Sequence, residues 1–167
     1  STLLASSAAS DVYKRQHMCP AGDNRWHWKA MQESFYMTNI CPQNHNLNRG
    51  DWKELEDACR LWTKKEGKLY IVCGPVLYRQ KHRTIGRKHK VTVPEAFFKV
   101  ILSTRNGHPK AIGFIFKNLS GNHPLKNYVN SVDEVERITG IDFFPALPDD
   151  VEKKVEAMQD LNLWSFR

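Results

Sequence analysis

Apolar residues recur at helical spacing in residues 51–65, where they follow one another by three or four positions. This spacing places them on one face of a helix. The face consists of Trp52, Leu55, Cys59 and Trp62. Gly67 stands where such a helix would end. The segment is therefore predicted to be an amphipathic helix packed against a core.

Short runs of apolar and β-branched residues predict strands elsewhere in the chain. They cover residues 35–40, 69–77, 95–103 and 110–117. Pro42 is predicted to end the first strand and Gly74-Pro75 to break the second, because proline cannot donate a ladder hydrogen bond. The second strand is also predicted to be buried. Asn106-Gly107 is predicted to be the turn between the last two strands.

Three further segments have helical character: residues 26–33, a segment opened by the capping pattern of Ser131 and Glu134, and the charged residues 148–158. The Asn-rich residues 43–50 are predicted to form a polar loop. Helices that flank antiparallel strands indicate the α+β class, with a mostly antiparallel sheet.

Composition narrows the class of protein. The chain has 167 residues, 41% of them hydrophobic and 26% charged, which suits one globular domain or a piece of a larger one. No run approaches the roughly 18 apolar residues of a membrane span, so no membrane partner is expected. The 4 cysteines are too few for a disulfide scaffold. A net charge of +7 favours an anionic partner such as nucleic acid.

The first sixteen residues differ in character from the rest. Residues 6–16, SSAASDVYKRQ, can be encoded by a string that resembles a transposon-based sequencing adaptor read in frame. We therefore interpret residues 1–16 as a non-native segment and residues 17–167 as the natural domain. Removing the segment takes away one net positive charge, since it contains Lys14, Arg15 and Asp11, so the basic character remains.

Polar and ionisable residues gather between positions 17 and 60. The run contains His17, Cys19-Pro20, Thr38-Asn39-Ile40-Cys41-Pro42-Gln43, Leu47-Asn48-Arg49-Gly50-Asp51-Trp52 and Leu55-Glu56. In order and spacing it resembles the signature of the DNA/RNA non-specific endonuclease family of ββα-metal nucleases. That signature is Asp-Arg-Gly-His, a Cys-Pro step, Ser-Asn-x-x-Pro-Gln, and Leu-Asn-x-Gly-x-Trp-x-x-Leu-Glu. The resemblance covers residues 17–160 and implies a ββα-metal fold that lacks its N-terminal part.

The resemblance implies an endonuclease that hydrolyses phosphodiester bonds in DNA and RNA with Mg²⁺ or another divalent cation such as Mn²⁺. It implies catalytic roles for His17, Asn39, Glu56 and Arg60, metal binding by Asn48, and supporting roles for Gln43 and Arg15. It also suggests a secreted or periplasmic protein.

The chemistry of these residues agrees with such roles. A histidine near neutral pKa is a suitable base for activating water, so His17 fits that role. We expect a backbone carbonyl of residues 34–36 to orient its ring. Mg²⁺ takes few protein ligands, so one amide oxygen from Asn48 is enough. Glu56 and Arg60 lie at i, i+4 and share a helix face, where Arg60 would contact phosphate; taken alone they are typical of an ordinary ion pair on a helix.

A basic stretch follows the second predicted strand. Residues 79–90, RQKHRTIGRKHK, contain no acid. Such a stretch is either a solvated hairpin or a rim that contacts phosphates without reading bases. The candidate nucleic-acid-binding residues are Arg79, Lys81, Arg83, Arg87, Lys88 and Lys90.

Two alternatives remain open. A zinc site from His17, Cys19, His27, Cys41 and His45 is disfavoured, because the spacings match no standard zinc motif. The second alternative is a basic fragment that binds nucleic acid without catalysis. Positions 14–16, where the signature has Asp-Arg-Gly, hold Lys14, Arg15 and Gln16. We therefore expect this chain to cut weakly or not at all unless those residues and the upstream region are restored.

Overall fold

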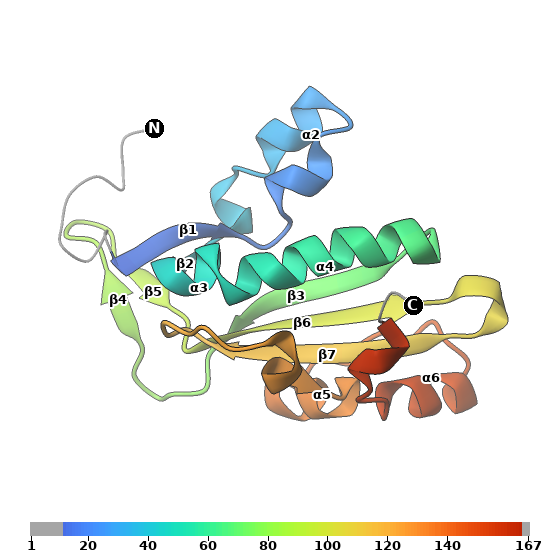
Figure 1. Cartoon of the computed structure of the whole chain (residues 1–167). Coiled ribbons are helices and arrows are strands. Elements are labelled where there is room, and N and C mark those ends of the chain that lie inside the picture. Colours follow the sequence, from blue (N-terminus) through green and yellow to red (C-terminus); the bar gives the residue numbers. More distant parts are fainter. Residues whose placement is uncertain (1–11, 165–167) are drawn as a thin grey trace.

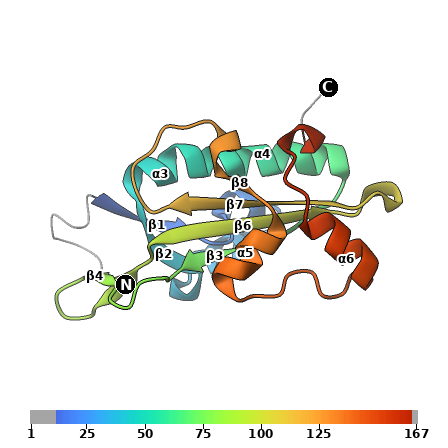
Figure 2. The same ribbon diagram turned by 90° about the horizontal axis from the view of Figure 1, so that it is seen from below.

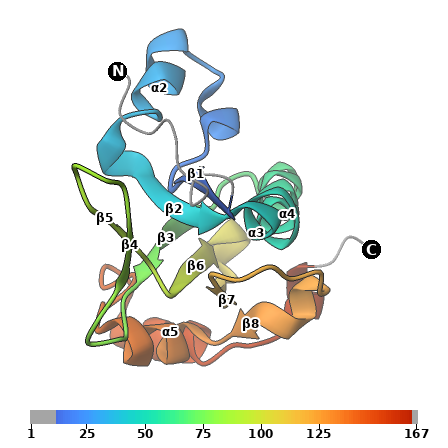
Figure 3. The ribbon, with the colours of Figure 1, turned by 90° about the vertical axis from the view of Figure 1, so that its left-hand side faces the viewer.

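The computed structural model describes residues 12–164, in which an antiparallel sheet lies between two helical layers (Figure 1). The sheet has the order β3-β6-β7-β8. These strands are β3 (Tyr70–Val76), β6 (Ala96–Ser103), β7 (Lys110–Lys117) and β8 (Val129–Asn130). Helix α4 (Asp51–Glu66) covers one face, and α5 (Val132–Thr139) and α6 (Asp149–Glu156) cover the other (Figure 3). The α+β prediction is confirmed.

The central strand β6 is buried along its whole length, because both of its faces are covered. Phe97 and Ile101 belong to the cluster under α4, which contains Trp52 and Leu55. Phe98, Val100 and Leu102 alternate with them and join the cluster under α5 and α6. One apolar layer thus holds α4 against the sheet, and the other holds α5 and α6 against its opposite face.

The amphipathic helix is the prediction that the structure matches best. Trp52, Leu55, Cys59 and Trp62 are all buried beneath α4. Gly67 ends the helix with a φ of 82°, a conformation that glycine adopts without strain. Ser131 caps α5 by accepting a hydrogen bond from the Glu134 backbone N–H at 3.1 Å, as its pattern predicted.

A second, smaller sheet lies beside α4, on the same side of the main sheet (Figure 3). Strand β1 (Tyr13–His17) pairs with β2 (Ile40–Asn44), which leads into α3 (His45–Arg49). Helix α2 (Trp28–Glu33) lies between the two strands in sequence, and the hairpin of β4 (Arg83–Ile85) and β5 (Val91–Val93) stands beside them (Figure 1). Short 3₁₀ turns complete the fold. They are η1 (Ala21–Asn24), η2 (Met37–Asn39), η3 (Arg105–Gly107), η4 (Leu125–Tyr128) and η5 (Leu161–Trp164).

The prediction of a strand at residues 35–40 and a loop after it was wrong. The strand begins at Ile40 and continues through Pro42, which lies opposite Arg15. Proline is tolerated because β2 pairs on one side only. The predicted polar loop contains α3, because the Asn44 side chain accepts hydrogen bonds from the backbone N–H groups of Asn46 and Leu47 and so starts a helix.

Strand β3 also departs from its prediction. It runs unbroken through Gly74 and Pro75 at the edge of the sheet. Tyr70, Ile71 and Val72 are exposed rather than buried, because no element of the described chain covers them. None of the helices in residues 12–164 has the length and apolar character needed to cross a membrane.

Candidate active site

Strand β1, the loop that follows it, and helices α3 and α4 surround one cleft of about 750 Å³. The side chains and backbone that line it come from Arg15, Gln16, His17, Pro20, Ala21, Gly22, Arg25, Asn48, Arg49, Lys53, Glu56 and Arg60. Five of the sequence-predicted site residues are in this set, namely Arg15, His17, Asn48, Glu56 and Arg60. Residues 45 positions apart in the chain therefore share a single cavity.

His17 is the last residue of β1, opposite Ile40 of β2. Its ring meets the Phe35 ring edge-on, with centroids 4.6 Å apart. The buried Nε2 atom has no hydrogen-bond partner within residues 12–164, and no carbonyl of residues 34–36 bonds the ring, so that prediction was wrong. Phe35 packing restrains the imidazole instead. Burial lowers the pKa of His17 below its usual value, against a smaller opposing effect of Glu56, which favours the neutral imidazole.

Asn48 is positioned by helix α3 and by a buried glutamine. Its Nδ2 donates to Gln43 Oε1 at 3.2 Å, and Gln43 itself is fully buried on β2. Gln43 therefore holds the amide of Asn48 from behind, which agrees with the supporting role predicted for it. None of the hydrogen bonds among the described residues uses Asn48 Oδ1, which leaves that oxygen for a ligand.

Glu56 is fixed by the core helix that carries it. The Trp52 indole donates to Glu56 Oε1 at 2.9 Å, and Trp52 is packed edge-on against Phe97 and Phe116. The carboxylate position thus depends on the apolar core beneath α4. One turn further on, Arg60 has a nitrogen 3.9 Å from the second carboxylate oxygen of Glu56.

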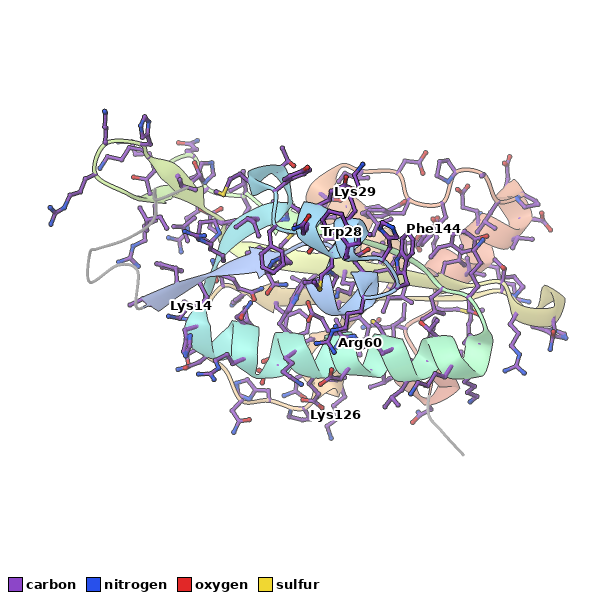
Figure 4. The ribbon with its side chains drawn as sticks, turned by 90° about the horizontal axis from the view of Figure 1, so that it is seen from above. Lys14, Trp28, Lys29, Arg60, Lys126 and Phe144 are labelled. Atoms are coloured by element: carbon purple, nitrogen blue, oxygen red, sulfur yellow. The ribbon has the colours of Figure 1, made fainter. Side chains whose placement is uncertain are left out.

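Arg60 reaches from α4 toward the segment after β1 (Figure 4). Its Nε donates to Asp23 at 2.6 Å and its Nη1 donates to Asp57 at 2.7 Å. A side chain at Gly22 would meet the guanidinium, since an added Cβ would lie 2.8 Å from an Arg60 nitrogen. Arg60 therefore lines the cleft as predicted, but two carboxylates share its donors.

Asn39 lies beside the cleft and does not line it. Its side-chain oxygen accepts from the Cys19 N–H at 2.9 Å, and its amide donates to the Cys19 and Ser34 carbonyls. All of these bonds are to backbone. The structure therefore gives Asn39 a positioning role for the loop after His17, in contrast to the direct role that the sequence suggested.

The sequence identified Gln16 only as a departure from the signature, and its contacts in the site were not predicted. It is 4% exposed, and its amide lies between two candidate site residues. Its Nε2 donates to Glu56 Oε1 at 3.1 Å and to the His17 carbonyl at 2.6 Å, while Asn48 donates to its Oε1. No pattern in the sequence signals this contact, because it joins residues 32 and 40 positions apart.

Three cations of the cleft were also missed, namely Arg25, Arg49 and Lys53. Lys53, Glu56 and Arg60 follow one another at i, i+3 and i+7, so helical spacing could have revealed that they share a face of α4. Together with Arg15 and Arg60, these residues give the cleft five basic groups against the one carboxylate of Glu56. An anionic ligand fits such a lining.

The same cleft fits a hard divalent cation. Asn48 Oδ1 and the Glu56 carboxylate are both hard oxygen donors, which Mg²⁺ and Mn²⁺ prefer, and Mg²⁺ retains most of its waters. His17 lines the same cleft. One oxygen of Glu56, Oε1, already accepts hydrogen bonds from the Gln16 amide and the Trp52 indole.

The basic stretch forms a solvated hairpin at the far end of β1. All six of its predicted nucleic-acid-binding residues are exposed. They are Arg79, Lys81, Arg83, Arg87, Lys88 and Lys90. Arg83 donates to the Tyr13 hydroxyl at 3.0 Å, which joins the hairpin to the start of β1. The exposed Lys14 and Arg15 of β1 extend the row of basic side chains from the hairpin to the cleft. This geometry is compatible with both interpretations of the stretch.

The zinc alternative finds no support in the part of the chain that is described. Among the described residues, the side chains that lie close enough together to hold a metal ion are three acidic residues of α5 and α6. They do not include the histidines and cysteines considered above. All four cysteines are free thiols. Burial raises the pKa of Cys59 to about 12, so this thiol is inert.

A strand that ends in histidine, a paired strand, and two successive helices that carry an asparagine and a glutamate define the ββα-metal class of nucleases. The chain matches the family described as DNA/RNA non-specific endonuclease over residues 2–150. It belongs to that family, which is one of divalent-metal nucleases.

Similar proteins include "Nuclease 1, mitochondrial" of Schizosaccharomyces pombe, 35% identical over 172 residues, with 92% of this chain and 53% of that protein covered. Human "Endonuclease G, mitochondrial" is 31% identical over 145 residues, with coverages of 80% and 48%. A crystal structure of an EndoG/EndoGI complex matches with a TM-score of 0.78 and 30% identity, covering 85% of this chain and 63% of that one. The chain spans about half the length of these curated relatives.

The names of the relatives correct one expectation. Proteins from yeasts, fish, frog and mammals that match this chain are named mitochondrial nucleases. The secreted or periplasmic location that the sequence suggested was therefore wrong. The adaptor interpretation of residues 1–16 stays a prediction; residues 1–11 lie outside the described part, and Tyr13–His17 forms β1.

Proposed function

We propose that this chain carries the catalytic cleft of a divalent-metal endonuclease that hydrolyses phosphodiester bonds of DNA and RNA without reading sequence. The observation that carries the proposal is the meeting of His17, Asn48 and Glu56 in one basic cleft. Phosphate is common to both nucleic acids, and five basic groups in the lining suit it. The names of the relatives support a mitochondrial location for such a protein.

In this mechanism neutral His17, which lines the cleft, takes a proton from the attacking water. Asn48 and Glu56 would hold a divalent cation and its waters, which would supply positive charge for the phosphate and the leaving oxygen. Arg15 and Arg60 contribute positive charge at the wall of the cleft. Gln43 keeps the Asn48 amide in place.

The test of this proposal is cleavage of plasmid DNA and of structured RNA with Mg²⁺, with and without a chelator. We expect both substrates to be cut only with the cation. Asn48→Ala should require more Mg²⁺ to reach half-maximal rate, because it removes a protein ligand. Asn46→Ala is the matched control, since Asn46 is exposed on the same helix and bonds Ser120.

Cleavage that persists in the chelator, or that responds equally to both asparagine variants, would contradict the metal site. Tight binding to DNA without any cleavage, even after Asp-Arg-Gly is placed at positions 14–16, would favour the second candidate, a basic nucleic-acid-binding fragment. The exposed cations of the β4–β5 hairpin are the observation that favours it.

Gln16→Gly is expected to increase the affinity of the cleft for Mn²⁺. The Gln16 amide donates to Glu56 Oε1, so removing the side chain leaves that oxygen with only the Trp52 indole as a donor among the described residues. Isothermal titration calorimetry measures the change. Lys14→Gly is the control, because it introduces glycine at an exposed position of the same strand. An equal change in both variants would show that strand flexibility, not the Gln16 amide, is responsible.

Replacing Lys81, Arg83, Arg87 and Lys88 with glutamine is expected to weaken DNA binding and flatten its salt dependence. Each lost phosphate contact reduces the slope of log K against log salt by about 0.7–0.9. The rate at which bound substrate is cleaved should change little, because the hairpin lies outside the cleft. Replacing Lys153 and Lys154, exposed on α6, is the control and should leave the slope unchanged.

A further inference from the structure

A second group of metal-binding side chains lies away from the cleft, between α5 and α6. Carboxylate oxygens of Asp133, Glu136 and Glu156 all lie within 4.8 Å of one another. The two helices lie side by side beneath the sheet, on the face opposite α4 (Figure 2). The group is therefore separated from the candidate active site by the whole sheet.

Glu156 is the unusual member of this group. It is 5% exposed, and its Oε1 is buried without a hydrogen-bond partner. Nearby Glu152 also has a buried Oε1 without a partner. A buried carboxylate without a partner is costly, so such a group normally takes up a proton or a cation.

The surroundings of Glu156 supply acids and no base. The ion pairs among the described residues leave Asp133, Glu136 and Glu156 without a lysine or arginine partner, since Arg137 pairs with Glu134. Burial, followed by the charges of Glu136, Glu152, Asp133 and Asp142, raises the pKa of Glu156 to about 7. The repulsion among these groups is the property that a divalent cation would relieve.

Three carboxylates supply the hard oxygen ligands that calcium prefers, and calcium takes about six to eight oxygens in a flexible geometry. Glu136 is already held in place, because its Oε1 accepts a hydrogen bond from the Phe143 N–H at 2.6 Å. One ligand is thus preorganised by the loop between the two helices.

We propose that Asp133, Glu136 and Glu156 form a calcium site that joins α5 to α6 and stabilises their packing on the sheet. The ligands are one preorganised carboxylate, one buried carboxylate and one exposed carboxylate, and water completes the coordination. The site is structural and does not depend on the proposed nuclease activity.

The test is thermal unfolding of the chain after chelator treatment, with and without added CaCl₂. A hundredfold excess of calcium over its Kd should raise the Tm by about 5–10 °C. Glu134→Gln should retain this shift, because Glu134 pairs with Arg137 on the surface. Asn48→Ala should also retain it, which separates this site from the cleft.

Asp133→Asn and Glu156→Gln should abolish the calcium shift. Glu156→Gln should also raise the Tm without calcium, because it removes a buried charge among acids. Asp133 is exposed, so Asp133→Asn keeps the test decisive if Glu156→Gln fails to fold. The proposal is overturned if calcium leaves the parent chain unchanged, which would mean that a proton satisfies Glu156. It is overturned equally if the shift survives in Asp133→Asn.

Discussion

His17→Ala is expected to lower the rate of phosphodiester cleavage by about 10²–10⁴-fold, the contribution typical of one positioned acid–base group. The measurement is single-turnover cleavage by a chain with Asp-Arg-Gly at positions 14–16 and with the upstream region restored. Substrate affinity should change far less, because the proton moves only in the transition state. The expectation rests on the place of His17 in the lining of the cleft and on the burial that lowers its pKa.

The control for this variant is His108→Ala, at an exposed position in the turn between β6 and β7. It should cut at the parental rate. A His17→Ala chain that cuts as fast as its parent would show that the water is activated by another group. The mechanism proposed for the cleft would then be wrong.

Trp52→Ala is expected to cost about 3–5 kcal/mol of the free energy of unfolding, the range found for large aromatic residues removed from cores. Trp52 is fully buried between Phe97 and Phe116 and joins α4 to the sheet. Chemical denaturation measures the loss. Trp28→Ala should change stability by less than about 0.5 kcal/mol, because Trp28 is 65% exposed.

Trp52→Phe separates the core from the site. Phenylalanine preserves the aromatic packing but removes the indole hydrogen bond to Glu56. We expect a small loss of stability, about 0.5–1.5 kcal/mol, and a clear loss of cleavage rate. A Trp52→Ala chain with the stability of its parent would contradict the core assigned to α4.

The elements that the sequence predicted well are those with strong local signals. The apolar spacing of Trp52, Leu55 and Cys59 identified α4, and Asn106-Gly107 identified the turn between β6 and β7. Residues Asn48 and Glu56 could be assigned to the site because the motif joins them through one short helix and the start of the next.

The features that the sequence did not predict depend on tertiary pairing. Pro42 lies within a strand because β2 pairs with only one neighbour, which no local pattern reveals. Asn39 turns its amide to the backbone of Cys19, and Gln16 reaches across to Glu56, through contacts between distant parts of the chain. The exposure of β3 likewise follows from its place at the sheet edge.

The central claim is that one cleft holds both the cation and the base. The most direct measurement is the anomalous scattering of Mn²⁺ in crystals of the Gln16→Gly chain bound to a phosphorothioate oligonucleotide. The account predicts a manganese peak about 2.0–2.2 Å from Asn48 Oδ1, and a phosphorus atom on the same wall of the cleft as the His17 ring. Manganese bound away from Asn48, or an oligonucleotide that leaves His17 uncontacted, would contradict it.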